Sequence, residues 1–153
     1  MKLLIRSLVI TCTAAAVAAL GVAGPAEAGT TSCGFKPLHD NAPLAEVRTC
    51  GEADGNRRRA LTTVFNHSPR PLDLTSVRSL ISSPEYAERE CVNTDVHSPV
   101  PLRLAPGQSI TCVTPWVTVR FPFQSGASAF SLITGSQDGR FFSHTSSFVA
   151  TFD

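Results

Sequence analysis

The sequence predicts an all-β fold, an antiparallel β-sandwich with two disulfides and at most one short helix. Stretches of alternating apolar and polar residues recur roughly every ten residues, separated by turn-forming residues, as in sandwiches and barrels. An even number of cysteines follows an apolar leader, which is typical of a disulfide-stapled exported chain. The chain has 153 residues, 42% of them hydrophobic and only 16% charged, a composition that excludes intrinsic disorder.

Residues 1–28 have the pattern of a cleaved secretory signal. Lys2 and Arg6 form a positive start, residues 8–23 are almost wholly apolar or small, and Ala26-Glu27-Ala28 resembles a signal-peptidase site. We therefore expect cleavage between Ala28 and Gly29. A membrane anchor is the alternative, but this Ala- and Gly-rich run falls short of the roughly 20 strongly apolar residues that a spanning helix needs.

Composition after the leader indicates an exported protein without a general attraction to polyanions. Loss of Lys2, Arg6 and Glu27 would turn 13 basic and 12 acidic residues into equal numbers. A net charge of zero argues against nucleic-acid binding. We expect no membrane span after signal removal and a secreted, extracellular location, either free or associated with the cell wall. The preference for Arg over Lys suggests a GC-rich bacterial source.

The remaining cysteines are Cys33, Cys50, Cys91 and Cys112. Three pairings are possible, and we favour Cys33–Cys50 with Cys91–Cys112 because sequence neighbours close smaller loops. Each bridge would contribute on the order of 3 kcal/mol by constraining the unfolded chain. A zinc site is the alternative, but the chain lacks a CxxC pair and a matching histidine spacing, so no metal is expected.

The N-terminal part is expected to be a loop-like segment of one domain spanning residues 29–153. Residues 29–54 have weak periodicity, so we assign 29–59 as a disulfide-tethered segment and 60–153 as the sandwich body. Arg57-Arg58-Arg59 reads as a solvated turn, with a protease-sensitive or anion-binding site as the alternative.

Two strands and one helix are expected in the next part of the body. Residues 60–65 and 72–74 alternate around the turn at Asn66–Pro69, which predicts a hairpin. Residues 82–90 form the one helical candidate, with Ser83 as N-cap and Pro84 at the first helical position.

The C-terminal half is expected to consist of strands and turns. Pro99 and Pro101 make residues 100–104 an edge strand, and Ala105-Pro106-Gly107-Gln108 has the residues of a type II turn. The remaining expected elements are a strand at 110–112, alternation at 117–123, a strand at 127–134, a five-residue hairpin loop at 135–139 and a strand from 140 to 152.

Two of these motifs resemble a known group of proteins. The stretch 64–72, Val-Phe-Asn-His-Ser-Pro-Arg-Pro-Leu, looks like the strand–turn–strand opening of small secreted immunoglobulin-like modules. The stretch 104–109, Leu-Ala-Pro-Gly-Gln-Ser, looks like their hairpin before a cysteine-bearing strand. Exported actinobacterial proteins use such modules. The resemblance covers residues 60–121 and implies an immunoglobulin-like sandwich, although Trp116 follows Cys112 instead of lying between the second pair of cysteines.

Catalytic motifs are weak. His39, His67, His97 and His144 could in principle join a Ser/His/Asp triad, but residues 126–130 lack the second glycine of a nucleophile elbow. Glu85, Glu88 and Glu90 read as a solvated face instead of a catalytic pair. We therefore assign no catalytic, cofactor-binding or metal-binding residue. An exposed member of Phe141-Phe142, or Trp116, would indicate a binding surface, but we expect these aromatic side chains to lie in the core.

The function expected from these observations is that of an exported, non-enzymatic module whose surface binds an unknown protein or cell-envelope partner. The first alternative is a secreted proteinaceous protease inhibitor. Its rigid loop would follow Cys91 and include Val92, His97 and Pro99, because preorganisation lowers the entropic cost of binding. A small secreted hydrolase is the third hypothesis.

Overall fold

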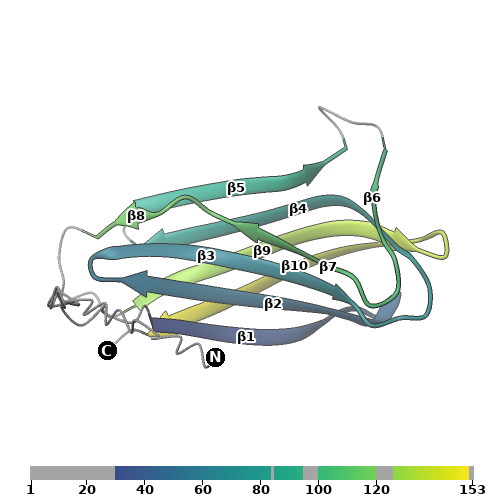
Figure 1. Ribbon diagram of the computed structural model, residues 1–153, viewed down its shortest axis with the longest axis horizontal. Coiled ribbons are helices and arrows are strands. Elements are labelled where there is room, and N and C mark those ends of the chain that lie inside the picture. Colours follow the sequence, from purple (N-terminus) through teal and green to yellow (C-terminus); the bar gives the residue numbers. More distant parts are fainter. Residues whose placement is uncertain (1–29, 84, 95–99, 120–125, 152–153) are drawn as a thin grey trace, which may run out of the picture.

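The chain folds as two antiparallel β-sheets packed face to face, without a helix among the residues described (Figure 1). The structure, a computed structural model, describes residues 30–83, 85–94, 100–119 and 126–151. The all-β class and the sandwich architecture predicted from the sequence are confirmed. The leader and the predicted cleavage site at Ala28 and Gly29 lie outside the described residues.

Each sheet has four strands in its main path and one short additional strand. The first sheet has the order β1-β2-β3-β7, and β8 also pairs with β3. Its strands are β1 (Thr30–His39), β2 (Ala42–Asp54), β3 (Arg57–Asn66), β7 (Ser109–Val113) and β8 (Val117–Thr118). The second sheet has the order β10-β9-β4-β5, and β6 also pairs with β4. Its strands are β4 (Leu72–Ser83), β5 (Glu85–Asn93), β6 (Leu102–Leu104), β9 (Gly126–Gln137) and β10 (Arg140–Thr151).

The expectation of a loop over residues 29–54 is wrong. Strands β1 and β2 form a long hairpin around a turn at Asp40 and Asn41. The inward side of β2 is built from Ala45, Val47, Thr49 and Ala53, which are small or hydroxyl-bearing and therefore give a weak hydropathy signal. These residues are nevertheless buried, because β2 lies inside its sheet between β1 and β3.

The helix expected at residues 82–90 is also wrong, because this segment contains the end of β4 and most of β5. The acidic residues of β5 are positioned by a neighbouring strand instead of a helix face. Arg78 on β4 forms an ion pair with Glu88 on β5, and the Tyr86 hydroxyl donates to the same glutamate. Cross-strand partners of this kind are not local in sequence, which explains why the local signal pointed to a helix.

The predicted hairpin between residues 60–65 and 72–74 is wrong as well, since the two stretches belong to different sheets. The segment between β3 and β4 crosses the sandwich instead of reversing within one sheet. Buried Asn66 organises this crossing: its amide donates to the carbonyl oxygens of Arg70 at 2.8 Å and Leu104 at 3.0 Å. The strand does end at Asn66 as predicted, but the Asn66 side chain directs the chain across to the other sheet.

The two best-defined turns have different outcomes. At Ala105–Gln108 the Gln108 amide donates to the Ala105 carbonyl at 3.0 Å and Gly107 has φ of 77°, which matches the predicted type II turn. The five-residue loop expected at 135–139 is instead a two-residue turn. Asp138 and Gly139 both have positive φ, 54° and 75°, as a type I′ turn requires.

Gly135 therefore belongs to β9, and close packing explains why this position is glycine. A Cβ there would lie 2.3 Å from the carbonyl oxygen of Asp73 and 2.8 Å from the Phe142 ring. Phe142 is 1% exposed and fills the space above this glycine, while Phe141 faces solvent with 63% exposure. The expectation that both phenylalanines lie in the core is confirmed for Phe142 and wrong for Phe141.

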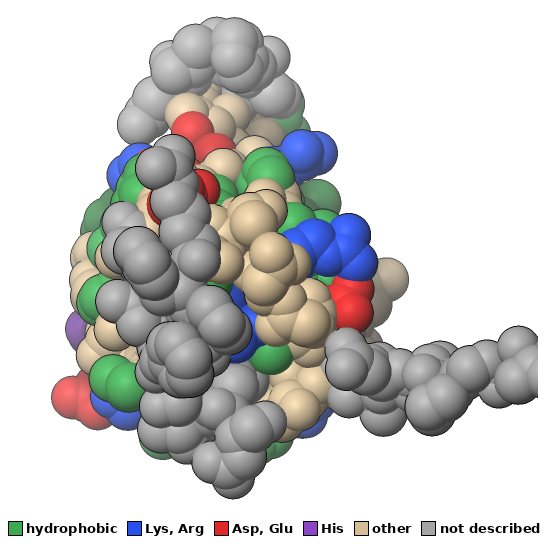
Figure 2. All heavy atoms as spheres, turned by 90° about the vertical axis from the view of Figure 1, so that its left-hand side faces the viewer, with side chains coloured by type: hydrophobic (Ala, Val, Ile, Leu, Met, Phe, Trp, Pro, Cys, Tyr) green, Lys and Arg blue, Asp and Glu red, His purple; other side chains and the backbone are tan. Residues whose placement is uncertain are grey.

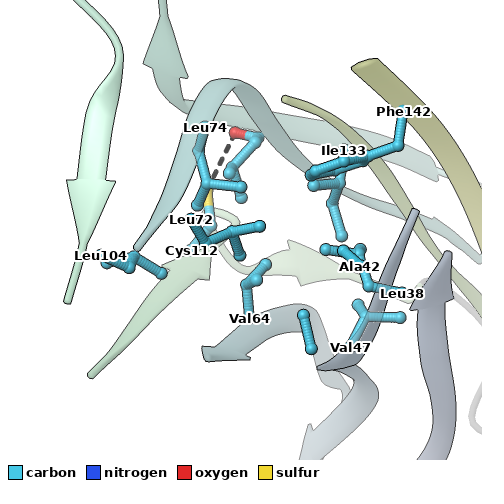
Figure 3. Packing of buried hydrophobic residues seen from close by; sticks show 12 residues of the cluster. Leu38, Ala42, Val47, Val64, Leu72, Leu74, Leu104, Cys112, Ile133 and Phe142 are labelled. Carbon is cyan, nitrogen blue, oxygen red and sulfur yellow. Dashed lines mark hydrogen bonds between the residues drawn. The ribbon is translucent and has the colours of Figure 1, made fainter. Parts of the chain in front are cut away.

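The core has two apolar clusters separated by hydroxyl groups. The larger cluster surrounds Phe142, Leu38 and Leu74 (Figure 3), and the smaller one is rich in alanine and contains Ile81. Between them the Ser131 hydroxyl lies 2.7 Å from both the Thr49 and the Thr62 hydroxyls, and all three residues are fully buried. These bonds satisfy the buried hydroxyl groups and link β2 and β3 of the first sheet to β9 of the second.

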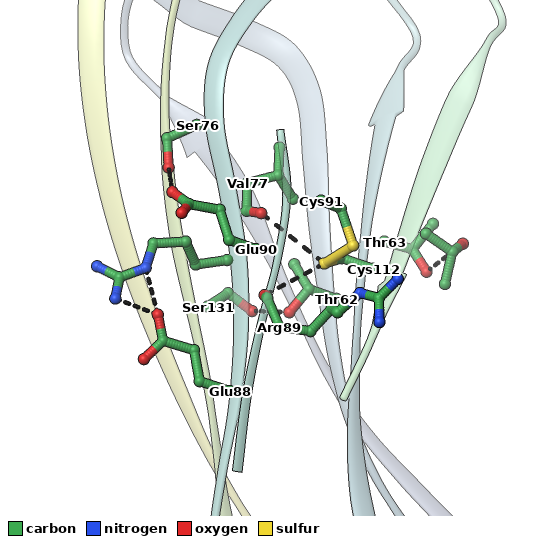
Figure 4. The surroundings of a disulfide bond; sticks show 12 residues. Thr62, Thr63, Ser76, Val77, Glu88, Arg89, Glu90, Cys91, Cys112 and Ser131 are labelled. Atoms are coloured by element: carbon green, nitrogen blue, oxygen red, sulfur yellow. Dashed lines mark hydrogen bonds and ion pairs between the residues drawn. A yellow bond between two sulfur atoms is a disulfide. The ribbon is translucent and has the colours of Figure 1, made fainter. Parts of the chain in front are cut away.

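Both predicted disulfides are present, but one lies within a sheet and the other joins the two sheets. Cys33–Cys50 joins directly opposed residues of β1 and β2 within the first sheet. Cys91–Cys112 joins β5 to β7 and therefore links the edge strands of the two sheets (Figure 4). Cys91 lies at an irregularity where Val77 pairs with Val92 but Arg78 pairs with Glu90. The extra residue is a bulge, which lets Cys91 leave its own ladder.

Candidate functional site: a two-part binding surface

Three connections meet at one end of the sandwich, on the right in Figure 1, and form a polar hollow. They are the β1–β2 turn, the β3–β4 crossing and the β9–β10 turn. The hollow has a volume of about 530 Å³. Its lining residues are Asp40, Asn41, Pro43, Leu44, Ser68, Pro69, Arg70, Gln137, Asp138 and Arg140.

An apolar groove of about 280 Å³ adjoins this hollow on the outer side of the first sheet. The groove and the hollow share Pro43 and Leu44, so the start of β2 forms the ridge between them. The other residues that line the groove are Phe35, Lys36, Pro37, Ala45, Glu46 and His67. We call the groove and the hollow together the turn-end surface.

Two large apolar side chains of the groove are open to solvent. Phe35 is 55% exposed on β1, and Leu44 is 54% exposed at the register irregularity near the start of β2. Isolated exposed apolar residues are ordinary, but here they adjoin Pro37 and Pro43 in a concave site. Burial of this surface by a partner would release water from apolar area, which is the usual driving force of association.

Aromatic rings and the Arg48 guanidinium group form a stack that contacts Phe35 of the groove. The Arg48 guanidinium carbon lies 4.4 Å from the centre of the Phe35 ring and 4.9 Å from that of Phe65. The Phe65 and His67 rings are nearly parallel, with centroids 5.7 Å apart. The His67 Nε2 atom lies 3.9 Å from a Glu46 carboxylate oxygen. The strands β1, β2 and β3 thus hold these outward side chains in one fixed row.

The polar hollow is also held in place by its own contacts. The Ser68 amide donates to the Asn66 side chain and the Arg70 amide donates to the Ser68 hydroxyl, each at 3.1 Å. The Arg70 guanidinium forms an ion pair with Asp138 of the β9–β10 turn, and this contact raises the pKa of Arg70. This ion pair therefore connects the β3–β4 crossing to the β9–β10 turn.

The histidines considered for a catalytic triad have other contacts. His39 Nδ1 accepts a hydrogen bond from the Asn41 amide at 3.1 Å, and its ring stacks on Phe142. His67 stacks on Phe65 in the groove. His97, together with Pro99 of the proposed inhibitory loop, lies outside the described residues. Val92, the first residue of that loop, belongs to β5 and packs against the larger core cluster.

The surroundings of His144 predict that the stability of the fold depends on pH. Its Nε2 atom is buried and has no hydrogen-bond partner among the described residues. Burial, followed by the positive charges of Lys36 and His39, lowers the pKa of His144 from its ordinary value of 6.5. Because the folded-state pKa is depressed, the unfolded chain takes up a proton first as the pH falls through this value, and stability decreases.

We expect the free energy of unfolding in urea to be lower at about pH 5 than at about pH 7.5, and His144→Gln to remove part of this difference. The variant provides the comparison, because every other titrating group is retained. An unchanged pH dependence in His144→Gln would show that His144 does not contribute in this way.

The arginine triplet lies at the opposite end of the sandwich and is engaged by neighbours. Arg57 pairs with Asp54, and the Arg59 Nε atom donates to Glu52 at 2.5 Å. The Trp116 ring lies under both guanidinium groups, 4.3 Å from that of Arg59 and 5.2 Å from that of Arg57. Figure 2 faces this end, and basic and acidic side chains lie side by side among its coloured atoms. Such compensation argues against an anion site at the triplet.

The residues that the structure describes lack two features. They contain no group of three or more His, Cys, Asp or Glu side chains placed to hold a metal ion. They also contain no helix long and apolar enough to cross a membrane.

Comparison with known proteins gives distant structural similarity. No family model and no curated protein matches the chain. The crystal structure of the putative ApaA protein from Bordetella pertussis is similar at a TM-score of 0.43 and 11% identity, over 82% of this chain and 92% of that one. The X-ray structure of a structural-genomics target is similar at a TM-score of 0.40 and 8% identity, over 80% and 86% of the two chains. Similarity at this level carries no information on function.

Proposed function

We propose that this protein is an exported, non-enzymatic binding module that holds a protein partner on the turn-end surface. The observation that carries the proposal is the apolar groove, in which Phe35 and Leu44 are each more than half exposed. The two disulfides are consistent with an oxidising compartment such as the extracellular space. Secretion through the predicted leader belongs to the same proposal.

The arrangement of the surface favours a protein over other partners. Interfaces between proteins commonly have an apolar centre and a polar rim, and the groove adjoins a hollow with charged side chains of both signs. The charges balance: Lys36 and Glu46 line the groove, while Arg70, Arg140, Asp40 and Asp138 line the hollow. Such balance gives no attraction for a polyanion, but it allows a partner to pair with either sign.

The rigidity of the surface supports the same proposal. Phe35, Lys36 and Pro37 of the groove are on the paired strand β1 beside the Arg48 stack, and the hollow is held by the Ser68 and Arg70 contacts. A surface that is already ordered loses little conformational entropy on binding. We expect the partner to insert an apolar side chain beside Leu44, with its polar groups over the hollow.

Peptide selection tests this proposal directly. Peptides from a random display library are selected on the oxidised protein, and their affinities are measured by fluorescence anisotropy. Leu44→Asp places an uncompensated charge at the ridge shared by groove and hollow, so we expect a roughly tenfold or greater loss of affinity, about 1.4 kcal/mol.

Val100→Asp is the matched control, because Val100 is 70% exposed and does not line the turn-end surface. Its affinity for the same peptides is expected to equal that of the unchanged protein. Peptides that bind Leu44→Asp as tightly as the unchanged protein, or that respond only to Val100→Asp, would contradict the proposed site.

A further inference from the structure

Strand β10 differs from the other outer strands of the sandwich in having no charge, proline, glycine or bulge over residues 141–151. Exposed edges are normally blunted by charges, prolines, bulges or shortness. Strand β1 contains Lys36 and Pro37 and has a register irregularity, β5 contains three glutamates and a bulge, and β7 has only five residues. Residues 141–151 of β10 contain no Lys, Arg, Asp, Glu, Pro or Gly.

The edge is also long and regular. Strand β10 has 12 residues and pairs with β9 from Arg140 to Thr151 without a bulge. Among the described strands β9 is its only ladder partner, so no described strand pairs with the other side of β10. The two apolar outward side chains, Phe141 and Val149, are 63% and 65% exposed.

The β9–β10 turn determines which backbone groups of β10 face the open edge. In a two-residue hairpin the residues flanking the turn, Gln137 and Arg140, bond to each other. Hydrogen bonding to β9 then alternates, so residues 141, 143, 145, 147 and 149 direct their amide and carbonyl groups to the open side. The Asn41 side chain donates to the Phe141 carbonyl at 2.7 Å, which confirms that this carbonyl faces away from β9.

The pattern of side chains along β10 is self-complementary. Phe141 and Val149 lie four residues before and four residues after Thr145, on the same outward face. If two copies pair antiparallel with Thr145 on the two-fold axis, Phe141 of each copy lies opposite Val149 of the other. Ser143 then lies opposite Ser147, and Thr145 opposite itself. Aromatic and β-branched residues are a favourable cross-strand pair, and no like charges face each other.

We infer that the protein forms a two-fold symmetric dimer through β10, in which the second sheets of two copies join edge to edge with Thr145 on the axis. In this register each odd-numbered residue meets another odd-numbered residue, so the outward-directed backbone groups face one another. At each end of the ladder the Phe141 carbonyl exchanges its bond from the Asn41 side chain for one from Val149 of the other copy. The interface is isologous and therefore closed, so pairing stops at two copies. The dimer does not depend on the turn-end surface being a binding site.

The mass of the oxidised protein is measured by light scattering after size exclusion over a concentration series. We expect a dimer that Thr145→Lys converts to monomer, because two lysines would meet at the axis. The melting temperature should be retained, because Thr145 is exposed. Ser109→Lys is the control: Ser109 is exposed on the β7 edge and should leave the dimer intact. Monomers at every concentration, or a dimer unaffected by Thr145→Lys, would overturn the inference.

Cysteine variants test the register itself. In the inferred dimer the two copies of residue 145 are about 5.5 Å apart, within the range for a disulfide. The two copies of residue 143 are offset by four residues along the strands, about 13 Å. Thr145→Cys should therefore form a covalent dimer on mild oxidation and Ser143→Cys should not. Equal crosslinking of both variants, or crosslinking of Ser143→Cys alone, would contradict this register.

Discussion

Replacing Phe142 by alanine is expected to lower the free energy of unfolding by about 3–5 kcal/mol, the cost of removing a buried phenylalanine. The ring is 1% exposed and belongs to the larger core cluster, where it also occupies the space beside Gly135. A larger residue at position 135 could not fill the cavity left by the ring, because a Cβ there would meet the Asp73 carbonyl. Urea unfolding followed by fluorescence or circular dichroism gives the value.

The neighbouring residue supplies a matched control. Phe141 has the same side chain on the same strand but points outward, so Phe141→Ala in the monomeric Thr145→Lys background should change stability by less than about 0.5 kcal/mol. Equal losses in the two variants would contradict the assignment of faces along β10, and with it the register on which the packing of the two sheets depends.

Removing the disulfide between the two sheets is expected to cause the second large loss of stability. The double variant Cys91→Ser, Cys112→Ser is expected to lose about 3 kcal/mol or more. This bridge joins edge strands of different sheets, Cys112 is fully buried, and its sulfur lies 3.4 Å from the Arg89 carbonyl oxygen. The variant therefore loses a constraint on the unfolded chain and also leaves a hydroxyl in the core.

The bridge within the first sheet should matter less. Loop length alone predicts similar effects, because the sequence separations are 17 for Cys33–Cys50 and 21 for Cys91–Cys112. However, β1 and β2 are already joined by a tight turn and by a ladder that runs through both cysteines. Urea midpoints of the two double-serine variants make the comparison. Equal loss would show that loop closure alone determines the contribution.

Local sequence patterns predicted the features that depend on near neighbours. Strand β3 and the β9–β10 hairpin follow from alternation, the type II turn follows from Pro106 and Gly107, and both disulfides follow from proximity in sequence. The errors concern features that depend on distant partners. The acids of β5 face Arg78 across a ladder, and the polar Asn66 crossing separates β3 and β4 into different sheets.

The candidate site was missed for the same reason. The segment expected to be a loop contains Phe35, Pro37, Pro43 and Leu44. In a loop, exposed apolar residues do not by themselves indicate a binding site. A usable signal was present: Phe35-x-Pro37 and Pro43-Leu44 lie on either side of the polar pair Asp40-Asn41, as in two strands that meet at a turn. The contribution of His67 and of the hollow could not be predicted, because it requires the positions of three separate connections.

Mapping a selected peptide on the protein by NMR tests most directly whether the turn-end surface binds a protein partner. We predict that backbone amide shifts change at residues 35–46 and at His67 on titration with the peptide, while those of the Glu85–Asn93 strand stay unchanged. Changes confined to β5, or to the arginines at the opposite end, would contradict the assignment of the binding site to the turn-end surface.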